Sequence, residues 1–183
     1  MTTEDRILRE ALRLAAETGW YELRLHLVAE RLGLPLAEVL RRFRDPDAVA
    51  DEWFRRALLA MAGELPPGLP PSARVELVPM RWFGAQAEHR AVVGQMLRAK
   101  LHASHLHHWL PLPFHLSRLI HAVLEAARLD ARGYPRHAEE VGLTLLFLRT
   151  LPLWLRDGST GQERTRGFLR RNLGWLDRLP RGR

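Results

Sequence analysis

Histidines gather in one short stretch of the sequence, and they are the side chains best suited to bind a metal ion. Six of the nine lie between positions 102 and 121: His102, His105, His107, His108, His115 and His121. Neutral imidazoles bind zinc, nickel or copper, and spacings of three residues place several of these rings on one helix face. No carboxylate is interleaved with them, and Pro111 and Pro113 indicate a loop. We therefore predict a surface or pocket cluster and no metal site, with metal binding as the alternative.

Nucleophilic catalysis has little support in the sequence. Ser104 lies beside His105 and His107 but outside any nucleophile-elbow motif. The sequence contains no phosphate-binding loop, dinucleotide fingerprint or paired-carboxylate motif. It also contains no cysteine, which excludes disulfides, cysteine-ligated zinc, iron–sulfur clusters and thiol nucleophiles. We predict that the protein is not an enzyme and has no cofactor.

Arginine side chains are the third chemically distinctive group, and they suggest an anionic partner. The 183 residues include 28 Lys or Arg and 21 Asp or Glu, a net charge of +7, and Lys100 is the single lysine. The excess is uneven, because residues 1–56 hold 10 basic and 11 acidic side chains whereas residues 57–183 hold 18 and 10. A nucleic-acid contact in the first third therefore has to use a few placed arginines rather than a broad basic field.

The elements that must position these groups are helices. Apolar residues recur at intervals of three and four, and no alternating run rich in Val, Ile or Thr appears. We predict an all-α protein with nine helices, at about 4–18, 25–32, 35–43, 46–62, 72–87, 88–101, 114–131, 136–156 and 162–178. The expected N-caps are Thr2 or Thr3 for the first helix and Asp45 for the fourth. Gly19 and Gly33 should end the first two helices in left-handed conformations.

Two short helices on either side of Gly33 make a helix-turn-helix candidate. Four prolines between positions 63 and 72 mark a stiff boundary after the fourth helix. The first 60 residues also combine Ile7-Leu8, Ala11-Leu12, Gly19-Trp20, Val28-Ala29, Leu32-Gly33-Leu34, Phe43 and Asp45-Pro46-Asp47-Ala48-Val49. This combination resembles the TetR family of transcriptional regulators. The resemblance implies a TetR-like fold with a helix-turn-helix DNA-binding head at residues 1–45 and a ligand-binding and dimerisation domain at residues 46–183.

The resemblance further implies a homodimer that binds double-stranded operator DNA, with an affinity modulated by a small apolar effector. The expected DNA contacts are Arg24, His26, Leu36, Ala37, Glu38, Arg41, Arg42 and Arg44. Arg41 or Arg42 suits a bidentate contact to guanine, and Glu38 suits cytosine N4. The alternative is that the arginines form a solvated helix end stabilised by the helix dipole.

Four positions depart from the family's pattern. Leu40 stands where a Tyr is usual, and Pro46 stands where a Lys is usual. Arg24 and Pro35 replace the Ser or Thr common before the second and third helices. Each departure removes a phosphate contact, and such contacts supply most of the affinity for DNA.

The helix predicted at 136–156 is apolar all round, since nine of the thirteen residues from Leu143 to Leu155 are Leu, Phe or Trp. A helix of this kind must be covered on both sides, so we predict that it and the last helix form a two-fold four-helix dimer interface. The expected interface residues are Leu145, Leu148, Leu151, Phe168, Leu169, Leu173 and Leu176. A core helix in a monomer is the alternative. Candidate walls of a ligand pocket are Trp82, Phe83, Met96, Trp109 and Phe114, with plain core packing as the alternative.

The last helix also supports a different function. Its apolar residues fall on one side and Arg166, Arg170, Arg171 and Arg178 on the other, which suits a dimer surface or an anionic membrane. Asp157, Ser159, Glu163, Thr165, Phe168-Leu169 and Leu173, with Gly19-Trp20, resemble the TetR-fold protein of ubiquinone biosynthesis, which binds lipid and not DNA. The alternative function is therefore lipid or quinone binding at a membrane surface. With no signal peptide and no run of about eighteen apolar residues, we expect a cytoplasmic location.

Overall fold

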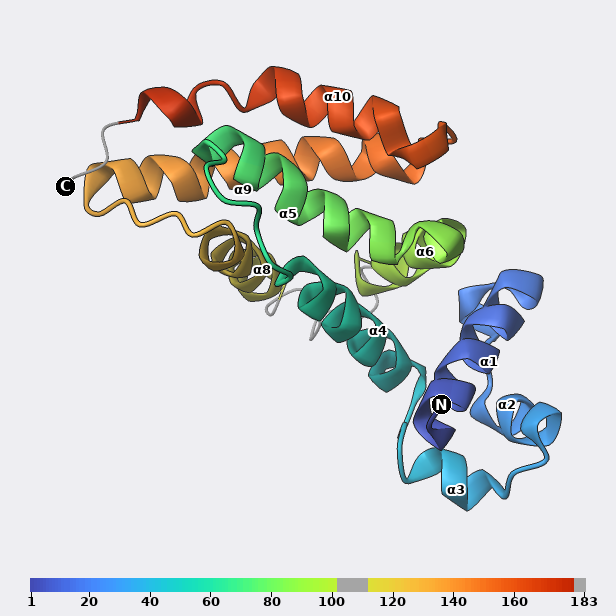
Figure 1. Ribbon diagram of the computed structural model, residues 1–183. Helices are drawn as coiled ribbons and strands as arrows, with labels where there is room; N and C mark the ends of the chain where they lie inside the picture. The colour runs from blue at the N-terminus through green and yellow to red at the C-terminus, as the bar shows by residue number, and fades with distance from the viewer. Residues whose placement is uncertain (102–111, 180–183) are drawn as a thin grey trace. The chain divides into compact units, whose positions relative to one another are not determined.

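The computed structural model describes residues 1–101 and 112–179, excluding the side chains of residue 101 and residues 112–115. Within these residues the chain is helical and has no strand, as Figure 1 shows. The α-helices are α1 (Thr3–Thr18), α2 (Leu25–Leu32), α3 (Leu36–Leu40), α4 (Pro46–Met61), α5 (Pro71–Ala85), α6 (Arg90–Leu101), α8 (Leu112–Ala126), α9 (Tyr134–Leu155) and α10 (Glu163–Asn172). The prediction of an all-α fold with nine helices is confirmed for the described part of the chain.

The described chain forms two compact units. The head unit comprises residues 1–56 and 86–101, and the body unit comprises residues 57–85 and 112–179. Helix α6 therefore belongs to the head unit, although α5 of the body unit precedes it in the chain. The predicted DNA-binding head at residues 1–45 lies inside the head unit, and its assignment to DNA stays a prediction.

The ends of α1 follow from its flanking residues. Thr2 and Asp5 form a capping box, in which each side chain accepts a hydrogen bond from the other residue's backbone N–H. The inner face of α1 includes Ile7 and Leu8, which are buried in the head core. Gly19 ends the helix at φ +95°, and its N–H donates to the Ala15 carbonyl. With ψ at 150°, Gly19 lies outside the left-handed helical conformation that was predicted for it, although its positive φ still favours glycine.

Helix α3 is shorter than predicted. The expected range was 35–43, whereas the helix spans Leu36–Leu40 and residues 41 and 42 form a turn. Arg42 N donates to the Val39 carbonyl three residues back, so the helix tightens before Phe43 enters the core. Asp45 then caps α4, because its Oδ1 accepts from the Ala48 N–H at 2.7 Å. This N-cap is as predicted.

The body unit contains an aromatic cluster at its centre. Trp82 and Phe83 of α5 meet Phe147 and Trp154 of α9, and the Phe83 and Phe147 rings stack 5.7 Å apart. Pro79 lies inside α5 without ending it. Around this cluster α8, α9 and α10 pack against α5 or each other. Leu169 of α10, and Leu173 and Leu176 after it, are buried in the same core.

Two helices of the body unit end earlier than predicted. Helix α8 ends at Ala126 rather than near 131, and Arg128 follows with φ +51°. The last helix, expected over 162–178, is divided into α10 and a short 3-10 turn at Leu176–Arg178. Gly174 has low helix propensity, and the break allows Leu173 and Leu176 both to be buried.

A buried carboxylate fixes the entry into α10. Asp157 is 1% exposed, and its two oxygens accept hydrogen bonds from the backbone N–H and hydroxyl of both Ser159 and Thr165, at 2.5–3.0 Å. Burial opposes its ionisation, but these four hydrogen bonds prevail and hold the pKa of Asp157 well below its ordinary value. The Asp-x-Ser stretch therefore has a structural role in joining α9 to α10.

Candidate nucleic-acid interface

Helices α2 and α3 form the predicted helix-turn-helix. Gly33 ends α2 in the left-handed region at φ +62°, and Pro35 precedes α3. Val39 and Phe43 are buried in the head core, which fixes the rotation of α3 about its axis. Seven of the eight residues expected to contact DNA are exposed: Arg24, His26, Leu36, Ala37, Arg41, Arg42 and Arg44. Glu38 is half-buried.

The charged side chains of α3 and its last turn pair with one another. Arg42 Nη1 donates to Glu38 Oε1 at 2.6 Å, and Arg41 pairs with the other Glu38 oxygen. The hydrogen bond from Arg41 is the main cause of a lowered pKa for Glu38. In the protein as described, Glu38 therefore neutralises part of the charge that Arg41 and Arg42 would offer to an anion. Glu38 is the half-buried partner in both pairs, whereas the Arg41 side chain is exposed and open to an incoming anion.

The arginines beside α3 are open to solvent. Arg44 has a side chain that is 83% exposed and lies 3.1 Å from Asp45. Arg24 precedes α2 and donates to the carbonyl of Tyr21 at 2.8 Å, with Glu22 at 3.7 Å. Both guanidinium groups lie at the surface, where the remaining N–H groups are positioned for phosphate oxygens.

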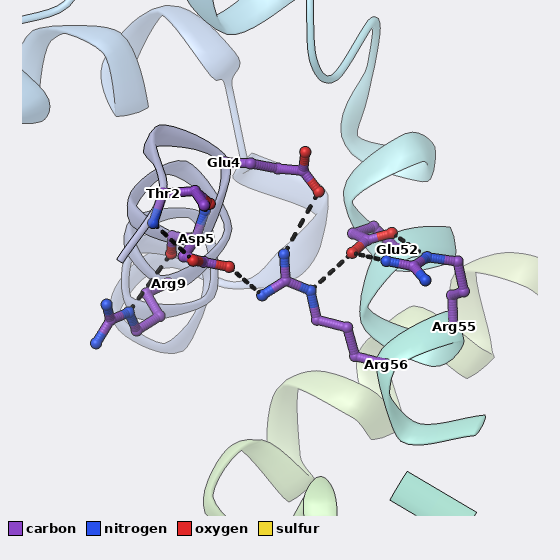
Figure 2. A network of polar contacts seen from close by, with 7 residues as sticks. All are labelled: Thr2, Glu4, Asp5, Arg9, Glu52, Arg55 and Arg56. Atoms are coloured by element: carbon purple, nitrogen blue, oxygen red, sulfur yellow. Dashed lines mark hydrogen bonds and ion pairs between the residues drawn. The ribbon is translucent and has the colours of Figure 1, made fainter. Parts of the chain in front are cut away.

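A network that the sequence did not reveal ties α4 to the start of α1 (Figure 2). Arg56 of α4 donates to Asp5 Oδ1 at 2.6 Å and to Glu52 Oε1 at 2.7 Å, and it lies 3.4 Å from Glu4. Asp5 is also the capping-box residue of α1, and hydrogen bonds from Thr2 and Arg56 hold its pKa well below the ordinary value. One arginine thus joins the N-terminus of α1 to the helix that follows the helix-turn-helix.

Helix α6 is attached to the head unit by a second unforeseen group of contacts. Gln95 Oε1 accepts from the Trp20 backbone N–H at 2.6 Å, directly after α1 ends. Lys100 of α6 pairs with Asp51 of α4 at 3.1 Å. Val92 and Met96 are buried in the head core. The partners in the two polar contacts are 49 and 75 positions apart in the chain, so no local sequence pattern indicated these contacts.

Three of the five residues predicted to line one ligand pocket have described side chains, and these three belong to two different units. Trp82 and Phe83 are buried in the body unit, whereas Met96 is buried in the head core, so its assignment to the pocket is wrong. Trp109 lies outside the described residues, and the side chain of Phe114 does too. The aromatic cluster encloses a void of only about 10 Å³, lined by Phe83 among others.

A larger hollow lies elsewhere in the body unit. A groove of about 480 Å³ is lined by Leu58, Leu59, Met61, Ala62, Gly63, Glu64 and Leu65 from α4 and the segment after it, and by Ala122, Glu125, Ala126 and Arg128 from α8 and its end. The lining is mainly apolar, with charged groups only at Glu64, Glu125 and Arg128. This composition and volume are typical of small-molecule sites.

The residues predicted for a dimer interface divide into two groups. Leu145 and Leu148 are exposed on α9, by 58% and 48%, and Leu151 and Phe168 are half-buried. Leu169, Leu173 and Leu176 are buried inside the body unit, so assigning them to an interface was wrong. Their side of α10 packs against α5 and α9 of the same chain, and this packing already covers it.

The histidine cluster has one member with a described side chain. His121 Nδ1 lies 2.8 Å from the Ser117 carbonyl, and its Nε2 lies 3.4 Å from Glu140. The described residues hold no group of three or more side chains placed to bind a metal. His102, His105, His107 and His108, and the side chain of His115, fall outside the description. The predicted surface cluster stays a prediction.

Comparisons with known proteins place the fold. No protein-family model matches the sequence, and neither does any curated protein. The TetR transcriptional regulator from Nitrosomonas europaea ATCC 19718 is similar in structure, with a TM-score of 0.83 and 35% sequence identity over 96% of this chain and 98% of that one. A TetR transcriptional regulator from Rhodococcus sp. RHA1 shares the fold at a TM-score of 0.60 and 19% identity, over 94% and 93% of the chains. Within the described residues, no helix is both long and apolar enough to cross a membrane. Because the likeness to the Nitrosomonas protein extends over nearly all of both chains at this identity, the chain belongs to the TetR family of transcriptional regulators.

Proposed function

We propose that the protein is a ligand-responsive, DNA-binding regulator that acts as a homodimer. Each protomer presents one helix-turn-helix to operator DNA, and two heads contact two half-sites about one helical turn, or a small multiple of it, apart. A small apolar effector in the body unit changes the affinity for the operator. The observation that carries the proposal is the helix-turn-helix with its exposed outer residues, in a chain whose family consists of transcriptional regulators.

The charge of the head unit supports a DNA contact that uses a few individually placed arginines. Its described residues hold 13 basic and 12 acidic side chains, so no broad positive field is present. Arg24, Arg41 and Arg44 are nevertheless exposed around one motif. We expect Arg24 and Arg44 to contact phosphates and so to fix the register of α3 in the major groove, and Arg41 to contact guanine.

Helix α9 supports dimerisation. Its exposed large apolar residues are Tyr134, Val141, Leu145 and Leu148, at spacings of seven, four and three. These spacings place them along one side of the helix, facing away from the body core. In a two-fold dimer the same face of both copies meets, and an apolar stripe is complementary to itself. The interface is therefore proposed on α9 alone, without the three buried leucines of the last two helical segments.

The effector site is proposed in the 480 Å³ groove between α4 and α8. Helix α4 also runs through the head unit, since residues 46–56 belong to it and residues 57–61 to the body unit. An occupant of the groove would touch Leu58 and Met61, on the same helix whose first half is tied to α1 through Arg56. A ligand that binds more tightly to one of two placements of α4 would shift the protein toward that placement and so change its affinity for DNA.

DNA binding is tested by selecting fragments of genomic DNA on the purified protein at moderate salt. We expect enrichment of a palindromic site, and Arg41→Ala should lower affinity for it by about tenfold or more. Arg55→Ala is the matched control, because Arg55 pairs with Glu52 at the same i,i+3 spacing as Arg41 with Glu38. Absence of any enriched sequence, or equal losses in the two variants, would overturn the proposal.

The alternative, lipid or quinone binding at a membrane surface, is supported by Leu40 and Pro46, which stand where the family usually places phosphate contacts. In the described structure, however, Leu169, Leu173 and Leu176 are buried and Arg170 pairs with Glu76 at 2.9 Å. A membrane contact through this face would require α10 to leave α5 and α9. Liposome or quinone binding that is lost in Arg170→Glu with Arg171→Glu, together with no DNA enrichment, would favour this alternative.

A further inference from the structure

The outer surface of α3 carries two leucines that the packing of the head unit leaves open. Leu36 and Leu40 are 41% and 44% exposed, and they are among the few large apolar side chains at the surface of the described chain. They lie four residues apart, so they share one side of the helix. Since Val39 and Phe43 anchor α3 in the core, the two leucines cannot rotate inward without undoing that core.

The charged and apolar residues of α3 occupy different flanks. At 100° per residue, Leu36 and Leu40 fall on one flank of the helix, Glu38 falls on the other, and Ala37 lies between them. Glu38 holds Arg41 and Arg42 on its own side through ion pairs. A partner that contacts α3 therefore meets apolar side chains on one flank and Ala37 in the middle. On the other flank it meets charged side chains that are paired with one another.

Only one group on the major-groove edges of the base pairs complements such an apolar flank. The edges of guanine, cytosine and adenine offer hydrogen-bond donors and acceptors, whereas thymine adds the apolar C5-methyl group. Leucine side chains have no hydrogen-bonding atoms, so they discriminate bases by contact with that methyl group. A leucine placed against a donor or acceptor of a base would instead bury that polar group without a hydrogen-bond partner.

We propose that Leu36 and Leu40 are specificity-determining residues that contact thymine methyl groups, so that the preferred half-sites carry thymine at the positions facing them. The inference rests on the proposed DNA binding and specifies the chemistry of that contact. Arg24 and Arg44 then supply affinity through phosphates, and the leucines add a preference for thymine to the guanine contact expected of Arg41 or Arg42.

Uracil-substituted DNA tests the proposal, because deoxyuridine keeps the hydrogen-bonding edge of thymidine and lacks only the methyl group. Each thymine of the selected site is replaced in turn by uracil, and the affinity of the full-length protein is measured by fluorescence anisotropy. We expect a loss of about threefold to tenfold at one or two positions in each half-site. In Leu36→Ala and Leu40→Ala the thymine and uracil duplexes should bind equally at those positions. Tyr21→Ala, at an exposed apolar residue of the head unit outside α3, should discriminate like the native protein.

The outcomes separate this inference from the proposed function. Equal binding of thymine and uracil duplexes at every position overturns the inference and leaves DNA binding in place. Discrimination that persists in both alanine variants overturns it as well, since another group then contacts the methyl. Failure to enrich any DNA overturns the proposed function and the inference together. Thermal melts monitored by circular dichroism show whether each variant is folded, which we expect because both leucines are exposed.

Discussion

Helices α3 and α9 both expose leucines, but their surroundings differ. The five residues of α3 include two leucines and Glu38. Arg41, Arg42 and Arg44 come directly after the helix. In α9 the exposed stripe runs from Tyr134 to Leu148, and Arg149 is the only charged residue from 141 to 155. Leucine thus occurs in a small patch rimmed by arginines and in a longer stripe that carries no charge at residues 141–148.

The difference indicates what each surface meets. A short apolar flank among arginines is complementary to DNA, where phosphates surround the few methyl groups of a groove. The part of the stripe at residues 141–148 carries no charge, so it is complementary to an identical surface without the desolvation of a charged group. Exposure alone does not distinguish these partners, and the neighbouring charges do.

The largest expected effect is on the α9 stripe. Leu145→Arg would place a guanidinium in the proposed interface of both copies, and its desolvation should raise the dimer dissociation constant about 1000-fold. Sedimentation equilibrium measures this change. Leu59→Arg is the control, because Leu59 is equally exposed, at 59%, but lies outside the stripe. A native protein that is monomeric at high concentration, or a Leu145→Arg variant that stays dimeric, would show that the α9 stripe has another role.

The second effect concerns Asp157, the buried carboxylate that joins α9 to α10. Asp157→Ala leaves two buried donors of Thr165 and two partly buried donors of Ser159 without their acceptor, and we expect a loss of about 3 kcal/mol in the free energy of unfolding at pH 7. Urea denaturation followed by circular dichroism measures the loss. An unchanged urea midpoint would mean that α10 does not depend on this carboxylate.

The contribution of Asp157 to the free energy of unfolding should depend on pH. The pKa of Asp157 is lowered in the folded state, so its contribution is fully present above the unfolded pKa of about 4 and is lost as pH falls below it. The difference in stability between native protein and Asp157→Ala should therefore be constant from about pH 5 to 7 and shrink at about pH 3. A difference that grows on acidification would contradict this sign.

A third prediction applies the α9 substitution to α3. Leu40→Arg places a further cation beside the groove, so the affinity for non-operator DNA should rise by about threefold to tenfold at low salt, with a steeper dependence on salt concentration. Its oligomeric state should not change. Fluorescence anisotropy over a salt series measures the affinity. A Leu40→Arg variant that loses its dimer, or gains nothing on DNA, would remove the distinction between the two helices.

The smallest effect is expected in the network of Figure 2. Arg56→Met removes the ion pairs that join α4 to Asp5 and Glu4, which are partly exposed, and the melting temperature should fall by about 3 °C. Arg55→Met keeps those pairs and serves as the control. If both variants melt alike, the link between α1 and α4 does not stabilise the head unit.

Local signals predicted most of the elements. Thr2, Asp45 and Gly33 each act through neighbours within five residues, so their caps and turns were visible in the sequence. The family resemblance, carried by short motifs of the first 60 residues, is also confirmed, and with it the prediction that the chain is a regulator and not an enzyme. Element ends were less accurate, because the burial of Phe43, Leu173 and Leu176 decided them.

The sites were harder to predict, since they depend on which surfaces remain uncovered. Helical periodicity correctly placed Leu169, Leu173 and Leu176 on an apolar side, but it could not tell that α5 and α9 of the same chain cover that side. Met96 was assigned to the body because of its place in the chain, whereas α6 packs into the head unit. Arg56 and Gln95 gave no local signal, because their partners are 51 and 75 residues away.

The contact between Lys100 and Asp51 has a practical consequence. Because Lys100 is the only lysine in the sequence, amine-reactive reagents have one side chain to modify, on the helix that packs against α1 and the start of the head unit. Acylation at this position removes the ammonium that pairs with Asp51, so a single label both cuts the contact between α6 and α4 and marks α6.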